Sequence, residues 1–108
     1  MTEPHVIRLR EPWDREPRPG CGTRLRRYFN TPTGLAPTTV VRIVCDGPTA
    51  AATAWLNDVA LGDHTANESS WSHEVTQNLL SRNELTIDVA ALATAELPWH
   101  EVRLEIVE

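Results

Sequence analysis

Lysine is absent from this sequence, and the 108 residues include only two Cys and one each of Met, Phe and Tyr. Two cysteines are too few for a disulfide scaffold, and Cys21 and Cys45 lack the spacing of a metal-binding motif. We therefore expect two reduced thiols, with Cys45 buried in a strand. The sequence predicts neither a metal site nor a cofactor.

Long apolar runs and a basic surface are also missing. No run approaches the roughly 20 apolar residues that cross a bilayer, and the first five residues do not resemble a leader peptide. The net charge is −5, with seven Arg against four acidic residues up to position 27 and three Arg against eleven beyond it. Because binding to phosphates calls for a basic surface, we expect no nucleic-acid partner. The lack of an apolar run and of a leader leads us to expect no membrane partner and a cytoplasmic location.

Short segments of alternating polarity are what the sequence does contain. Residues 51–56 alternate with the period of two that is typical of a strand, and Asn57-Asp58 follows them. Asn and Asp tolerate the positive φ values of a two-residue hairpin loop, so we predict a hairpin over residues 53–62. Residues 85–89 and 102–108 also alternate, with one face expected in the core.

About eight such segments are separated by turn residues, and no sustained helix is indicated. The spacing of Val75 and Leu79 predicts one helical turn, and we allow at most two short ones. This pattern predicts an all-β, antiparallel β-sandwich formed by a single domain. Residues 1–22 are interpreted as an N-terminal strand or tether and a proline-rich loop over 11–19, and residues 23–108 as the sandwich.

A set of short motifs, in order along the chain, resembles a known domain. The motifs are Arg27-Tyr28-Phe29-Asn30-Thr31-Pro32, Asp46-Gly47, Ala54-Trp55-Leu56-Asn57 with Leu61-Gly62, Trp71 before Glu74-Val75-Thr76, Arg82-Asn83-Glu84-Leu85-Thr86-Ile87, and Val102-Arg103-Leu104-Glu105-Ile106. Their order over about residues 24–108 resembles the galactose-binding-like, sugar-binding jelly-roll domain of family 2 glycoside hydrolases.

This resemblance implies a jelly roll of eight or nine strands that serves as an accessory to a catalytic barrel. The barrel is missing from this chain, so the resemblance implies a non-catalytic module. In some relatives the acid of a motif before the last strand reaches the sugar, and this implies a sugar contact for Glu101.

Four tryptophans supply the aromatic surfaces on which a sugar could stack. We expect Trp55 and Trp71 in the core, because the first lies in a strand and the second matches an inward-facing position of the family. Trp13 and Trp99 lie in loop-like segments and are the predicted ligand platforms. Beside Trp99, His100 and Glu101 supply polar groups, so the predicted ligand-binding residues are Trp99, His100, Glu101 and Trp13.

Catalysis is not expected from the sequence. Ser72, His73 and Glu74 are adjacent in a predicted strand, where neighbours point to opposite faces and cannot form a relay. Our first hypothesis is therefore a non-catalytic module with a carbohydrate as its candidate ligand. The alternative is a protein-interaction or self-assembly domain with no small-molecule ligand. In it, exposed Trp side chains and the arginine-rich N-terminal segment meet a protein partner or the second copy of a homodimer.

Overall fold

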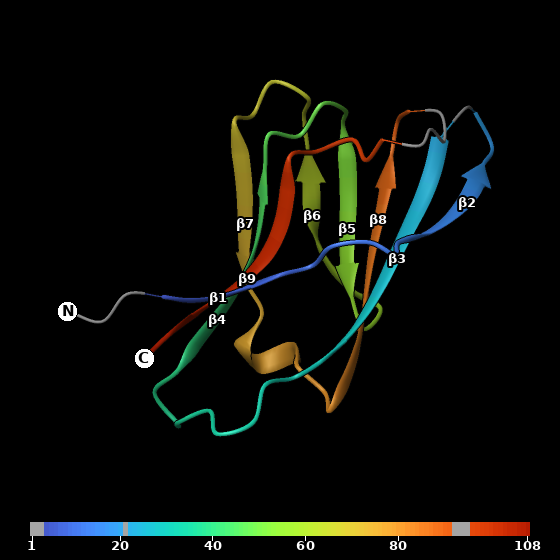
Figure 1. Ribbon diagram of the computed structural model, residues 1–108. Helices are drawn as coiled ribbons and strands as arrows, with labels where there is room; N and C mark the ends of the chain where they lie inside the picture. The colour runs from blue at the N-terminus through green and yellow to red at the C-terminus, as the bar shows by residue number, and fades with distance from the viewer. Residues whose placement is uncertain (1–3, 21, 92–95) are drawn as a thin grey trace.

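The computed structural model describes residues 4–20, 22–91 and 96–108. Within these residues the chain forms nine strands and one 3-10 turn (Figure 1). They are β1 (His5–Arg8), β2 (Asp14–Arg18), β3 (Gly22–Asn30), β4 (Val40–Asp46), β5 (Ala52–Leu56), β6 (Val59–His64), β7 (Ser70–Glu74), η1 (Thr76–Asn78), β8 (Arg82–Val89) and β9 (Glu101–Val107).

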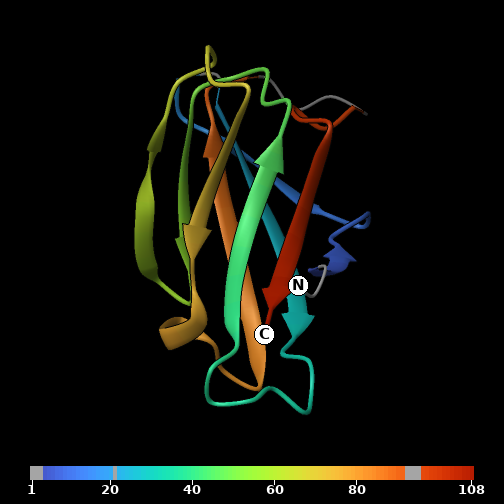
Figure 2. The same cartoon turned by 90° about the vertical axis from the view of Figure 1, so that its left-hand side faces the viewer.

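Two antiparallel sheets pack face to face, which confirms the predicted all-β sandwich (Figure 2). One sheet has the order β1-β9-β4-β7 and the other the order β2-β3-β8-β5-β6. From β3 onward, most connections carry the chain from one sheet to the other, and only the β5–β6 connection is a hairpin within a sheet. Strands β6 and β7 are therefore edge strands of different sheets.

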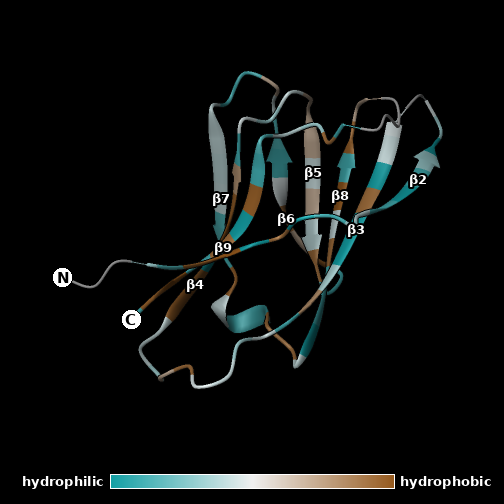
Figure 3. Ribbon diagram, in the orientation of Figure 1, coloured by the Kyte–Doolittle hydropathy of each residue, from teal (hydrophilic) through white to brown (hydrophobic). Residues whose placement is uncertain are grey.

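The core lies between the sheets and is built by alternation along each strand. In β9, Val102, Leu104 and Ile106 are buried while the residues between them are partly exposed. Figure 3 shows the same alternation of hydrophobic and hydrophilic residues along β9. Val75, just before η1, is fully buried, and Leu79 packs on the core, as the predicted helical turn requires. No helix among the described residues is long and apolar enough to span a membrane.

The predicted hairpin is present. Asn57 and Asp58 have φ values of 51° and 68°, and they join β5 to β6. Both values lie in the left-handed region that a two-residue hairpin loop needs to follow the strand twist. The register shifts between Ala54 and Trp55, whose partners are Gly62 and Ala60, so the extra residue of this bulge is Leu61 in β6.

The N-terminal segment was only partly predicted. Strand β1 pairs with β9, as one of the two alternatives proposed for it. The prediction of a loop over residues 11–19 is wrong for Asp14–Arg18, which pair with β3. Pro17 is accommodated because β2 is an edge strand, where a missing N–H can face away from the only neighbour.

Candidate functional site

The segment before β9 and the segment after β1 lie against each other, and this brings the predicted site residues together. The rings of Trp13 and Trp99 meet edge to face, with 4.9 Å between centroids and 64° between planes. Their exposed fractions are 3% and 8%, and the indole N–H of Trp13 donates to the Leu9 carbonyl at 3.0 Å. The prediction of exposed aromatic platforms at these positions is therefore wrong, because the rings close one end of the core.

His100 lies at the surface on a loop that is fixed to the end of β4. Its backbone N–H donates to the Asp46 carbonyl at 2.9 Å, and the Thr49 N–H donates to the Pro98 carbonyl at 3.0 Å. Gly47 has a φ of +64°, and a Cβ there would lie 2.9 Å from the Cβ of His100. Only glycine fits this close approach without a shift of backbone.

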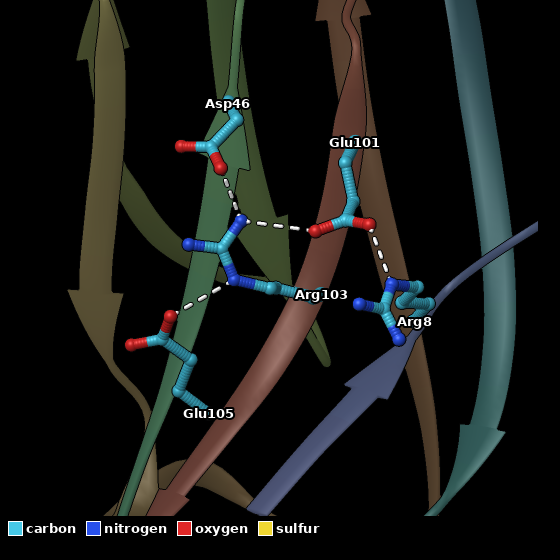
Figure 4. Close-up of polar contacts among 5 residues, drawn as sticks. All are labelled: Arg8, Asp46, Glu101, Arg103 and Glu105. Atoms are coloured by element: carbon cyan, nitrogen blue, oxygen red, sulfur yellow. Dashed lines mark hydrogen bonds and ion pairs between the residues drawn. The ribbon is translucent and has the colours of Figure 1, made fainter. Parts of the chain in front are cut away.

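Glu101 lies on the outer face of β9, between two arginines (Figure 4). One carboxylate oxygen accepts a hydrogen bond from Arg8 Nε at 2.8 Å, and the other accepts one from Arg103 Nη1 at 3.1 Å. Arg103 also donates to Asp46 and, at 2.9 Å, to Glu105. The network joins β1, β9 and β4.

The arrangement keeps Arg103 charged. Burial disfavours its charged form, but the hydrogen bonds to Asp46 and Glu105 outweigh this effect and raise the pKa of Arg103. Both oxygens of Glu101 are thus engaged with permanent cations. Any sugar hydroxyl that reaches Glu101 would have to share an oxygen with Arg8 or Arg103.

A hollow of about 270 Å³ lies beside this network. It is lined by Arg8, Leu9, Arg10, Glu11, Leu97, Trp99, His100, Glu101 and Val102. Its polar groups suit hydroxyls, but Trp99 is too deeply buried to offer the face of its ring. The hollow therefore presents polar side chains but no exposed aromatic ring.

A second hollow contains a tryptophan that sequence reasoning assigned to the core. Trp55 is half-buried and lies on the outer face of the five-stranded sheet, because Ala54 and Leu56 face inward. The predicted alternation along β5 is correct, but its direction is opposite to the expected one. The face with the small alanines is buried, and the face with Trp55 is not. Trp71, by contrast, is in the core as predicted.

Charged side chains surround Trp55. The guanidinium carbon of Arg24 lies 5.7 Å from the ring centroid, within the range of a cation–π contact. Two hydrogen bonds of 2.7 and 2.8 Å to Asp88 fix that guanidinium. The groove here has a volume of about 300 Å³ and is lined by Arg24, Arg26, Trp55, Asp58, Glu84 and Thr86.

Sequence comparisons identify no relative: no family model matches this chain, and no curated protein matches it. Solved structures do match. A Bifidobacterium dentium β-glucuronidase complexed with coumarin-3-O-glucuronide aligns with a TM-score of 0.79 and 16% identity over 98% of this chain and 30% of that one. An uncultured Clostridium sp. β-glucuronidase aligns with a TM-score of 0.77 and 13% identity over 98% and 29%.

A putative β-galactosidase from Bacteroides fragilis aligns with a TM-score of 0.67 and 18% identity over 82% of this chain and 15% of its own. These matches confirm the jelly-roll fold that the sequence resemblance implies. The chain spans less than a third of the length of each of these glycosidases. At such low identities, the likeness is one of fold.

Proposed function

We propose that this chain is a non-catalytic carbohydrate-binding module and that the sugar lies in the groove beside Trp55. The observation that carries the proposal is the position of Trp55 among charged side chains on an outer sheet face. An aromatic side chain covers the apolar side of a pyranose, while arginine and carboxylate groups hold its hydroxyls. Among the four tryptophans, Trp55 is the one that is not buried.

The groove already holds such polar groups in fixed positions. Arg24 is fixed by Asp88, and Arg26 lies 2.8 Å from Glu16 and 3.9 Å from Glu84. Side chains held in this way lose little conformational freedom when a ligand binds. The fold shared with parts of glycosidases that act on glucuronides and galactosides supports a carbohydrate as the ligand class.

The carboxylates of the hollow near Trp99 do not support catalysis. Glycoside hydrolysis uses a carboxylic acid with a raised pKa that faces a second carboxylate. The pKa of Glu11 is lowered instead, chiefly by its side-chain hydrogen bond with Arg15 and also by the N–H of Trp13. Glu101 is engaged by Arg8 and Arg103. We therefore propose binding without hydrolysis.

Titration with a panel that includes glucose, galactose, glucuronic acid and their oligosaccharides tests the proposal. We expect saturable chemical-shift changes and a change in tryptophan fluorescence, both lost in Trp55→Ala and kept in His100→Ala. The reverse outcome, loss in His100→Ala alone, would move the site to the predicted hollow of His100 and Glu101. No response to any sugar at millimolar concentration would overturn the proposal.

The alternative of a protein-interaction or self-assembly domain stays a prediction, but the structure gives it less support. It depended on exposed tryptophans, and Trp13 and Trp99 are buried. It also depended on N-terminal arginines, most of which bind partners within the chain, as Arg8 does with Glu101 and Arg24 with Asp88. Sedimentation over a range of concentrations tests self-assembly directly, and a mass that rises with concentration would support this alternative.

A further inference from the structure

Two histidines face each other across the open edge of the sandwich. His64 ends β6 and His73 lies in β7, so they come from edge strands of different sheets (Figure 2). Their Nε2 atoms are 2.7 Å apart, with 4.9 Å between ring centroids. The two rings therefore share one hydrogen bond, in which one Nε2 donates a proton to the lone pair of the other.

His64 is held so that its Nε2 lone pair faces His73. A carboxylate oxygen of Glu68 accepts a hydrogen bond from His64 Nδ1 at 2.9 Å, which places the ring proton on Nδ1. Trp71 stacks on the same ring, with 4.4 Å between centroids and 2° between planes. Only 11% of the His64 side chain is exposed. The ring is thus fixed on one face and at both nitrogens.

The backbone at Gly62 passes close to the His73 ring. Gly62 has a φ of +152°, and a Cβ at this position would lie 3.2 Å from Cε1 and 3.6 Å from Nε2 of His73. A side chain at position 62 would therefore press on the His73 ring. Glycine at position 62 avoids this contact.

We propose that His64 and His73 bind a divalent transition-metal ion between their Nε2 atoms. Zinc–nitrogen bonds are about 2.0–2.1 Å, so a tetrahedral ion separates two ligand nitrogens by roughly 3.3 Å. The rings need to part by only about 0.6 Å from their present contact. The ion takes the place of the shared proton, which moves through solvent to Nδ1 of His73, so that both rings ligate as neutral imidazoles.

Glu68 would not contact the ion itself but would orient the His64 ring through its hydrogen bond to Nδ1. Histidines that bind metals commonly donate their other N–H to a carboxylate, which orients the ring and increases its basicity. Among the described residues, no group of three or more His, Cys, Asp or Glu side chains is placed to hold a metal. The site therefore has two protein ligands, and water completes the coordination.

Two consequences follow from this geometry. The ion would cross-link β6 to β7 and so join the two sheets at their open edge, which stabilises the folded state. Affinity should follow the usual order for nitrogen ligands, with Cu²⁺ bound more tightly than Ni²⁺ or Zn²⁺. The sequence does not pair the two histidines, because nothing local indicates that their strands meet.

Calorimetric titration of the full chain with Zn²⁺, Ni²⁺ and Cu²⁺, together with thermal melts, tests the proposal. We expect one ion per chain and a melting temperature that rises with metal concentration. His73→Gln should abolish both effects, and Glu68→Gln should weaken binding about tenfold. His100→Gln is the matched control, because His100 is exposed and its backbone is bonded to the end of β4, and it should bind like the wild type.

A measurement on the wild-type protein keeps the test independent of how the variants fold. Substoichiometric Cu²⁺ should broaden the ring NMR signals of His64 and His73 before those of His100. Equal broadening of all histidines, equal affinity in His73→Gln as a folded protein, or no thermal shift at millimolar Zn²⁺ would each overturn the proposal.

Discussion

Asn57 and Asn83 hydrogen-bond to each other through their side-chain amides, with 3.0 Å between Asn57 Nδ2 and Asn83 Oδ1. Asn57 Oδ1 also accepts the backbone N–H of Glu84 at 2.9 Å. Asn83 accepts the N–H of Leu80 at 2.9 Å and donates to the Phe29 carbonyl at 3.3 Å. This pair ties the β5–β6 hairpin to β8 and to the segment after η1.

Asn83→Ala should be among the most destabilising single substitutions. The side chain is 1% exposed, and its removal leaves several buried polar groups without partners. Each such group costs about 1–3 kcal/mol, so we expect a loss of about 3 kcal/mol in the free energy of unfolding, measured with denaturant. Asn67→Ala, at an exposed position, is the control and should change stability by less than about 0.5 kcal/mol. Similar losses in both variants would contradict this role.

Gly47→Ala and Gly34→Ala separate steric contact from backbone strain. Both glycines have positive φ values, 64° and 79°, but a Cβ at Gly34 meets nothing within 4 Å. Gly34→Ala should therefore cost only the left-handed strain of about 1–2 kcal/mol. Gly47→Ala should cost about 1 kcal/mol more, because its Cβ meets that of His100. Equal losses in the free energy of unfolding for the two variants would show that the 98–100 loop shifts away from the new Cβ without a measurable cost.

Cys45 should be inert in the folded protein. Its exposed fraction is 1%, and burial, followed by the charge of Asp46, raises the pKa of its thiol to about 12. The thiolate is the reactive form, so almost none is present at pH 8. In a Cys21→Ser variant, iodoacetamide should label Cys45 only after denaturant is added. Labelling of the native protein at the rate of a free thiol would contradict this expectation.

Strands and turns were predictable from the sequence where the residues of a single segment are enough to indicate them. Val102, Leu104 and Ile106 alternate, and Asn57-Asp58 is a turn, whatever lies next to them. The wrong predictions concern segments whose structure depends on the neighbouring strands. Pro17, for example, fits a strand only because that strand lies at the edge of its sheet.

Burial and long-range contacts required the packed structure. Trp13 and Trp99 are far apart in sequence, and their rings meet only in the folded chain, where both belong to the core. Trp55 faces outward because the residues on either side of it, Ala54 and Leu56, occupy the buried face of β5. The contact of His64 with His73 depends on two edge strands that no sequence period relates. Local patterns therefore predicted the strands well, whereas the burial of Trp13 and Trp99 and the contact of the two histidines depend on the packed sheets.

Arg103→Gln tests how much the network on the outer face of β9 contributes. The substitution leaves Asp46, Glu101 and Glu105 close together without their shared cation. Because the side chain of Arg103 is only 17% exposed while that of Asp46 is 37% exposed, we expect a loss of about 1–2 kcal/mol in unfolding free energy, less than for a fully buried pair. The loss should shrink in high salt, which screens the remaining repulsion.

Arg10→Gln, at an exposed position just after β1, is the control and should change stability by less than about 0.5 kcal/mol. A double-mutant cycle with Asp46→Asn should recover most of the effect as coupling, and additive losses would mean that the ion pair contributes nothing.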